Sequence, residues 1–158
     1  LDRFLMHLNL DYPSAETEFQ IMRMSRNEAL KQELPQVDPI IQGDIFAARE
    51  HALQIYLAEP LEKYIVDIIM ATRKPEAYSQ ELASWLEYGV SPRATLSLVR
   101  CARARAYLHE RDFVSPEDIQ AVAPNVLRHR LLLSYQAQAD GVSADDVINH
   151  ILSQVAVP

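Results

Sequence analysis

Glycine and cysteine are scarce in this sequence, with three glycines and one cysteine, Cys101, among 158 residues. So few glycines argue against sheet-rich folds, whose tight turns need positive φ. One cysteine excludes an intrachain disulfide and a multi-cysteine zinc site, and is compatible with a reducing cytoplasm. Apolar runs such as residues 65–71 are far shorter than the roughly 20 residues that cross a membrane. We therefore expect a cytoplasmic protein with no membrane partner.

Positive charge is scarce overall but concentrated in one stretch. The 15 Lys and Arg are outnumbered by 22 Asp and Glu, which gives a formal net charge of −7. Nucleic-acid binding needs a basic surface, so we expect no nucleic-acid partner. Between Ser91 and Arg111, however, five arginines accompany a single acid, Glu110. A local arginine patch that binds nucleic acid therefore stays an alternative for this stretch alone.

Hydrophobic spacing and capping residues predict a mainly α-helical bundle. Ser-Pro pairs at Ser91 and Ser115 mark helix starts, because serine caps free amides and proline has no N–H to lose. We expect helices over residues 14–30, 44–54, 61–72, 92–110, 116–122 and 124–128, and a last one after residues 141–143. Apolar residues nearly surround the helix over 92–110, so it is predicted to be central. We expect a short helix or a loop over residues 79–86. Extended segments are expected at residues 55–57 and 130–133.

One strand is expected near the N-terminus. Apolar side chains in residues 4–10, FLMHLNL, alternate with the period of two that is typical of strands. A lone strand is not stable, so it must pair with a sheet formed elsewhere. Residues 31–43 contain two prolines and a glycine and indicate a linker. Because the chain begins with Leu and reads from the start like the middle of a domain, we interpret it as an excised fragment.

Arg93 occupies an unfavourable position for a cation. It lies in the first turn of the helix expected after Ser91, where the helix end carries partial positive charge. The free amides of that end and a guanidinium would together suit a phosphate. Arg100, seven residues later, lies on the same face of the helix. The alternative is that Arg93 reaches solvent or pairs with an acid of a neighbouring helix.

Arg3 lies directly before the expected strand. An arginine held rigidly at a domain edge can reach the phosphate of a neighbouring molecule. The alternative is an ion pair with Asp2 or Asp11. The five histidines lack metal-ligand spacing, and no metal site is expected. The chain also lacks a GxxxxGK[ST] loop and an acidic Mg²⁺-holding strand, which fits a nucleotide-binding part cut away upstream.

Three stretches carry a resemblance to a known family. LDRFLMHLNLDYPSAETEFQI, GVSPRATLSLVRCARARAYLHERDFVSPEDIQAVAPNVLRHRLLL and GVSADDVINHIL, in this order, resemble the C-terminal portion of the MoxR family of AAA+ ATPases. The resemblance implies that residues 1–12 are the last strand of the ATPase core. Residues 13–43 would then be a connecting helix and linker, and residues 44–158 the helical lid domain.

The resemblance also implies roles for both arginines. Arg3 matches the arginine finger that reaches the γ-phosphate of ATP in the adjacent subunit, which makes it the catalytic candidate. Arg93 matches the sensor-2 residue, a nucleotide contact of the lid that acts in cis or in trans. Four further arginines receive no role and stay candidates for contact with solvent or an interface: Arg100, Arg103, Arg105 and Arg111.

For the intact parent, the family implies a homo-oligomeric ring, a hexamer, that uses ATP and Mg²⁺. ATP hydrolysis would remodel or mature client proteins in a chaperone-like role, with proteins carrying von Willebrand A-type domains among the partners. The fragment alone is expected to be inactive and to bind neither ATP nor Mg²⁺ tightly. The alternative function, from a different class, is a helical protein-interaction module with no nucleotide chemistry.

Overall fold

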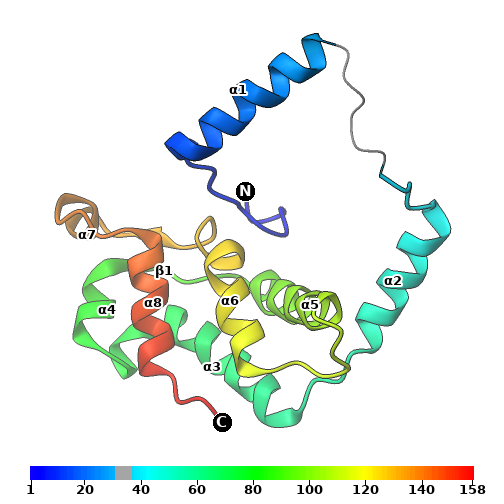
Figure 1. Cartoon of the computed structure of the whole chain (residues 1–158). Coiled ribbons are helices and arrows are strands. Elements are labelled where there is room, and N and C mark those ends of the chain that lie inside the picture. The colour runs from blue at the N-terminus through cyan, green and yellow to red at the C-terminus, as the bar shows by residue number, and fades with distance from the viewer. Residues whose placement is uncertain (31–36) are drawn as a thin grey trace.

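The computed structural model describes residues 1–30 and 37–158 and is mainly helical (Figure 1). The described elements are α1 (Ala15–Ala29), α2 (Gln42–Gln54), α3 (Glu59–Arg73), the 3₁₀ turn η1 (Pro75–Ala77), α4 (Gln80–Trp85), β1 (Leu86–Tyr88), α5 (Pro92–Leu108), α6 (Pro116–Leu127), β2 (Leu132–Leu133), α7 (Tyr135–Ala139) and α8 (Ala144–Gln154). The predicted mainly α-helical class is confirmed.

The core lies between α3, α5, α6 and α8. Ile65 and Ile68 of α3, Leu98 of α5, Ile119 of α6 and Ile148 of α8 are completely buried. Helix α5 packs against α2, α3 and α6, which confirms that it is central. It is not buried all round, however, because Leu96 remains 59% exposed on the side opposite the alanine-rich buried face. The helix therefore has a free face, and this face carries the candidate site.

Local capping chemistry explains where the helices begin. The Ser91 hydroxyl accepts from an amide of the first turn of α5, and Ser14 caps α1 in the same way. Ser115 and Ser143 each form a reciprocal capping box with the aspartate three residues later, at the starts of α6 and α8. Such boxes satisfy amides that have no partner inside the helix. The helix starts predicted at these serines are confirmed.

Two element predictions are wrong. Residues 4–10 form no strand, because strands are held by hydrogen bonds to a neighbouring strand and no strand lies beside this segment in the described residues. The break expected before Pro124 is also absent, since α6 continues through it to Leu127. Pro124 removes one helical hydrogen bond, and the complete burial of its neighbours Ala123 and Val126 holds the helix together.

Short extended segments tie distant parts of the bundle together. Strands β1 and β2 pair antiparallel, with Leu86 opposite Leu133, so residues 130–133 are extended over part of their length. Tyr56 forms a parallel bridge with Phe113, which confirms the extended segment expected at residues 55–57. Residues 79–86, left open between helix and loop, contain α4, which Ser79 caps. Helix α7 was not predicted.

The N-terminal helices are far less buried than the bundle. No residue of α1 or α2 is buried, and α1 stands away from α3–α8 (Figure 1). The expected linker lies partly outside the described residues, and its last two positions, 42 and 43, belong to α2. None of the described helices is both long and apolar enough to cross a membrane. The domain boundaries at residues 12 and 43 stay predictions.

Candidate functional site

Arg93 is held by the docking of the loop before α5 onto the end of α3. The Thr72 hydroxyl accepts from the Val90 amide at 3.2 Å, and Arg73 Nε donates to the Val90 carbonyl at 2.9 Å. Gly89 makes this approach feasible, because a Cβ there would lie 2.3 Å from the Thr72 carbonyl oxygen. The start of α5 therefore has a fixed position on the bundle.

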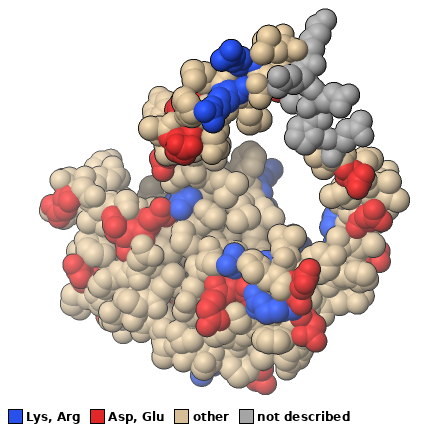
Figure 2. Space-filling model, in the orientation of Figure 1, with Lys and Arg blue, Asp and Glu red and all other residues tan. Residues whose placement is uncertain are grey.

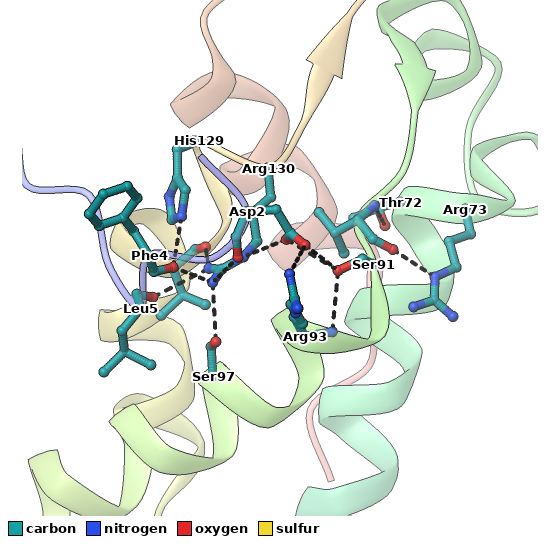
Figure 3. A network of polar contacts seen from close by, with 12 residues as sticks. Asp2, Phe4, Leu5, Thr72, Arg73, Ser91, Arg93, Ser97, His129 and Arg130 are labelled. Carbon is teal, nitrogen blue, oxygen red and sulfur yellow. Dashed lines mark hydrogen bonds and ion pairs between the residues drawn. The ribbon is translucent and has the colours of Figure 1, made fainter.

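The Arg93 side chain points from this helix start toward Asp2 (Figure 3). Its Nη1 lies 3.7 Å from a carboxylate oxygen of Asp2, and 56% of the side chain remains exposed. The alternative predicted for Arg93, a pair with an acid, is thus partly realised, although the acid comes from the N-terminal segment and not from a helix. A loose, exposed pair of this kind contributes little stability.

Asp2 joins the N-terminal segment to the start of α5. It accepts from the Ser91 hydroxyl at 2.9 Å and from Arg130 Nε at 3.2 Å. Burial by itself raises the pKa of Asp2, but the hydrogen bonds from Ser91 and Arg130 and the charges of Arg130 and Arg93 outweigh it, so the pKa is lowered. Asp2 is therefore an anion at neutral pH and partly neutralises the arginines around it.

Arg3 and Arg93 line the same surface pocket, of about 340 Å³, although they are 90 positions apart in the sequence. Arg3 is exposed and has no ion-pair partner among the described residues, so the expected alternative of a pair with Asp2 or Asp11 is not realised. Arg100 and Arg130 line the pocket too. Four guanidinium groups face one carboxylate, and this excess of positive charge suits an anion such as a phosphate.

Arg130 is the residue that sequence reasoning missed. Its side chain is only 2% exposed, and its donors reach the backbone carbonyls of Asp2, Phe4 and Leu5 as well as the Asp2 carboxylate. The available signal was the run of three basic residues, 128–130, directly after the apolar helix α6. Basic residues are common at helix C-termini, so that run has an ordinary local explanation.

The two neighbours of Arg130 in the run also hold the N-terminal segment. Arg128 donates to the His7 carbonyl at 2.9 Å and pairs with Asp145 at 3.0 Å. Burial lowers the pKa of His129, so its ring is neutral at pH 7 and the Nε2–H can donate to the Phe4 carbonyl, 3.2 Å away. Residues 2–7 are thereby fixed against the start of α5 and the end of α6.

Two arginines of the 91–111 stretch are structural. Arg111 makes a two-pronged ion pair with Asp118, at 2.6 and 2.7 Å, and Arg105 Nε lies 3.4 Å from the same carboxylate. Asp118 also accepts from the Ser115 amide in the capping box of α6. These contacts give Arg105 and Arg111 an anionic partner inside the bundle.

The described part of the chain offers no group of side chains suited to a metal ion. It contains no group of three His, Cys, Asp or Glu side chains that could hold a metal ion. On the face shown in Figure 2, basic and acidic side chains are interspersed.

Comparison with known proteins gives a consistent result. A family model described as an AAA lid domain matches residues 82–151. Chaperone MoxR1 of Mycobacterium tuberculosis is 41% identical to this chain over 160 residues, and Protein MoxR of Methylorubrum extorquens is 32% identical over 171 residues. The solved structure of a candidate ATPase from Cytophaga hutchinsonii superposes with a TM-score of 0.90 at 39% identity.

The matches to the two MoxR proteins and to the solved structure each cover 99% of this chain but only part of the relative. The share is 41% of the M. tuberculosis protein, 49% of the M. extorquens protein and 47% of the C. hutchinsonii chain. The chain thus spans less than half the length of the relatives it matches.

Proposed function

This chain belongs to the MoxR family of AAA+ ATPases, and on that basis we propose that its lid and N-terminal segment bring Arg3 and Arg93 to the terminal phosphate of ATP. The observation that supports the proposal most strongly is their shared pocket, which also contains Arg100 and has an excess of positive charge. A phosphoryl group in transfer spreads negative charge over its oxygens, so guanidinium groups fixed around it lower the barrier.

Arg93 is suited to a sensor-2 role. Its guanidinium touches Asp2 only at 3.7 Å, and more than half of the side chain is exposed. A terminal phosphate carries more negative charge than a single carboxylate and can therefore take Arg93 from Asp2. After hydrolysis the terminal phosphate leaves, so Arg93 would lose its contact with the phosphate and return to Asp2.

Arg3 is suited to an arginine-finger role toward an adjacent subunit. It is exposed, yet its backbone is fixed on both sides by the contacts of Arg130 with Asp2, Phe4 and Leu5. A finger needs this combination, because a side chain that reaches another subunit contributes to catalysis only when its base is rigid. We assign no described residue to Mg²⁺.

For the whole protein, we propose a cytoplasmic homo-oligomeric ring that uses ATP hydrolysis to remodel or mature client proteins. The relative in M. tuberculosis is named a chaperone, and this name supports the proposal. We include proteins with von Willebrand A-type domains among the proposed clients. No partner in nucleic acid or membrane is proposed.

Substitution of the two arginines in the full-length protein tests the assignment. We expect Arg3→Ala and Arg93→Ala each to lower ATP turnover by at least about tenfold, because each removes a positive charge from the transferring group. The fold should be unaffected, since Arg3 is exposed and Arg93 is loosely paired. Steady-state ATPase rates measure the first effect, and circular dichroism checks the second.

Arg49→Ala is the matched control, because Arg49 is an exposed arginine of α2 that does not line the pocket. It should leave turnover within about twofold of the unmodified protein, as is usual for an exposed side chain away from the chemistry. If the Arg3 and Arg93 variants behave like this control, the assignment is wrong.

A further inference from the structure

Arg130 holds the backbone on both sides of Arg3. Its Nη2 donates to the carbonyl of Phe4 at 2.6 Å and to that of Asp2 at 3.3 Å, and its Nη1 donates to the carbonyl of Leu5 at 3.3 Å. The carboxylate of Asp2 receives Nε at 3.2 Å. All these acceptors belong to residues 125–128 positions away in the sequence.

The same guanidinium is anchored on two helices of the lid. Its Nη1 also donates to the carbonyl of Val126 in α6, and its Nη2 donates to the Ser97 hydroxyl of α5 at 3.2 Å. Burying a guanidinium is costly unless its donors are satisfied, and here six acceptors surround five N–H groups. Arg130 therefore connects the N-terminal segment, α5 and α6 as one unit (Figure 3).

Asp2 extends this unit to the other candidate arginine. The carboxylate that accepts from Arg130 also accepts from the Ser91 hydroxyl at 2.9 Å and lies 3.7 Å from Arg93. Arg3 is thus fixed through its backbone to the helix that carries Arg93. A movement of the lid would carry both side chains together.

We propose that Arg130 is a positioning residue for ATP hydrolysis, which locks the segment bearing Arg3 onto the lid so that Arg3 and Arg93 move as one body. The inference rests on the proposed function of Arg3 and Arg93. Arg130 itself does not touch the phosphate, because its donors are occupied by protein acceptors. It acts through Arg3.

Arg130→Lys in the full-length protein is the central test, because it keeps the positive charge and removes the planar guanidinium group with its five N–H donors. An ammonium has three donors for the six acceptors, so the segment around Arg3 loosens while the lid stays folded. We expect kcat for ATP to fall by about tenfold or more, as for Arg3→Ala, with KM for ATP within about twofold.

Arg111→Lys is the matched control. Arg111 also forms a bidentate ion pair within the bundle, but its partner is Asp118, and it makes no hydrogen bond to the N-terminal segment. It should lower the melting temperature and leave kcat unchanged. An equal loss of kcat in both variants would mean that Arg130 serves only general stability, and the proposal would be overturned.

The double variant Arg3→Ala with Arg130→Lys gives the sharpest result. If Arg130 acts through Arg3, the double variant has a kcat within about twofold of Arg3→Ala alone, because residues acting as a unit are not additive. If kcat of the double variant instead falls by the product of the two single losses, the proposal is overturned.

Hydrogen exchange at the amides of Phe4 and His7 tests the lock without any ATPase measurement. These amides donate to the carbonyls of Leu1, at 3.0 Å, and Asn125, at 2.8 Å. Exchange should become at least about tenfold faster in Arg130→Lys and stay unchanged in Arg111→Lys. Full activity of Arg3→Ala would refute the proposed function, whereas unchanged exchange and kcat in Arg130→Lys would refute only the lock.

Discussion

Asp118 shows how a single residue can decide the stability of the lid. Its carboxylate is almost completely buried and holds Arg111 and Arg105 while capping α6. Burial by itself raises the pKa of Asp118, but the hydrogen bonds from Arg111 and Ser115 and the charge of Arg111 outweigh it, so the pKa is lowered. The folded state therefore binds the proton of Asp118 less readily than the unfolded chain.

The lowered pKa of Asp118 predicts how the stability of the fold depends on pH. A lowered pKa in the folded state stabilises the fold above the ordinary aspartate value of 3.8, and the contribution is lost as the pH falls below it. Asp118→Asn should lower the free energy of unfolding by about 3 kcal/mol at pH 7, because Arg111 is left without its anion. Urea unfolding at several pH values should show that the difference in free energy of unfolding between Asp118→Asn and the unmodified protein becomes smaller below pH 3.8. A pH-independent difference would contradict this explanation.

Residue roles differ in how far the sequence reveals them. Arg93 could be found from sequence because a cation in the first turn of a helix is locally unfavourable and needs an explanation. Arg130 could not, because three of its six acceptors are backbone carbonyls more than 120 positions away. Backbone carbonyls leave no trace in the residue types of the segment that supplies them.

Among the elements, helix starts were the most predictable feature. The caps at Ser91, Ser115 and Ser143 depend on residues within three positions, so local chemistry suffices to find them. The continuation of α6 through Pro124 depends on burial against other helices, which no local pattern contains. The same holds for residues 4–10, whose alternation is real but whose strand would need a neighbour.

The loop between β1 and α5 allows a prediction at the scale of elements. Gly89→Ala would place a Cβ 2.3 Å from the Thr72 carbonyl oxygen, against backbone that cannot move freely. We expect a loss of about 1–3 kcal/mol in stability, and a lower ATPase rate in the full-length protein because the start of α5 shifts and carries Arg93 with it. Thermal melting and turnover measure the two effects.

Gly43→Ala is the control for this variant. Gly43 lies in the first turn of α2, and a Cβ there meets nothing nearer than the side chain of Ile41 at 4.0 Å. Alanine favours helix over glycine, so Gly43→Ala should keep or slightly raise the melting temperature. Equal effects of the two substitutions would show that close packing at Gly89 is not the cause.

For the whole molecule, the central feature is the convergence of two distant parts of the chain on one pocket. The net charge of −7 gives no hint of a local cluster of arginines, because composition averages over the surface. The family resemblance predicts roles for Arg3 and Arg93, and the structure adds Asp2 and Arg130, which line the same pocket and contact each other. Helix α1 contributes no buried residue to this arrangement.

The most direct measurement is a structure of the full-length protein with a non-hydrolysable ATP analogue. We predict that the guanidinium groups of Arg3 and Arg93 from one subunit both lie about 2.8 Å from oxygens of the same terminal phosphate, which an adjacent subunit binds. Arg93 should then have left Asp2, while Arg130 keeps its contacts with the segment around Arg3. A bound terminal phosphate that neither Arg3 nor Arg93 contacts would contradict the account.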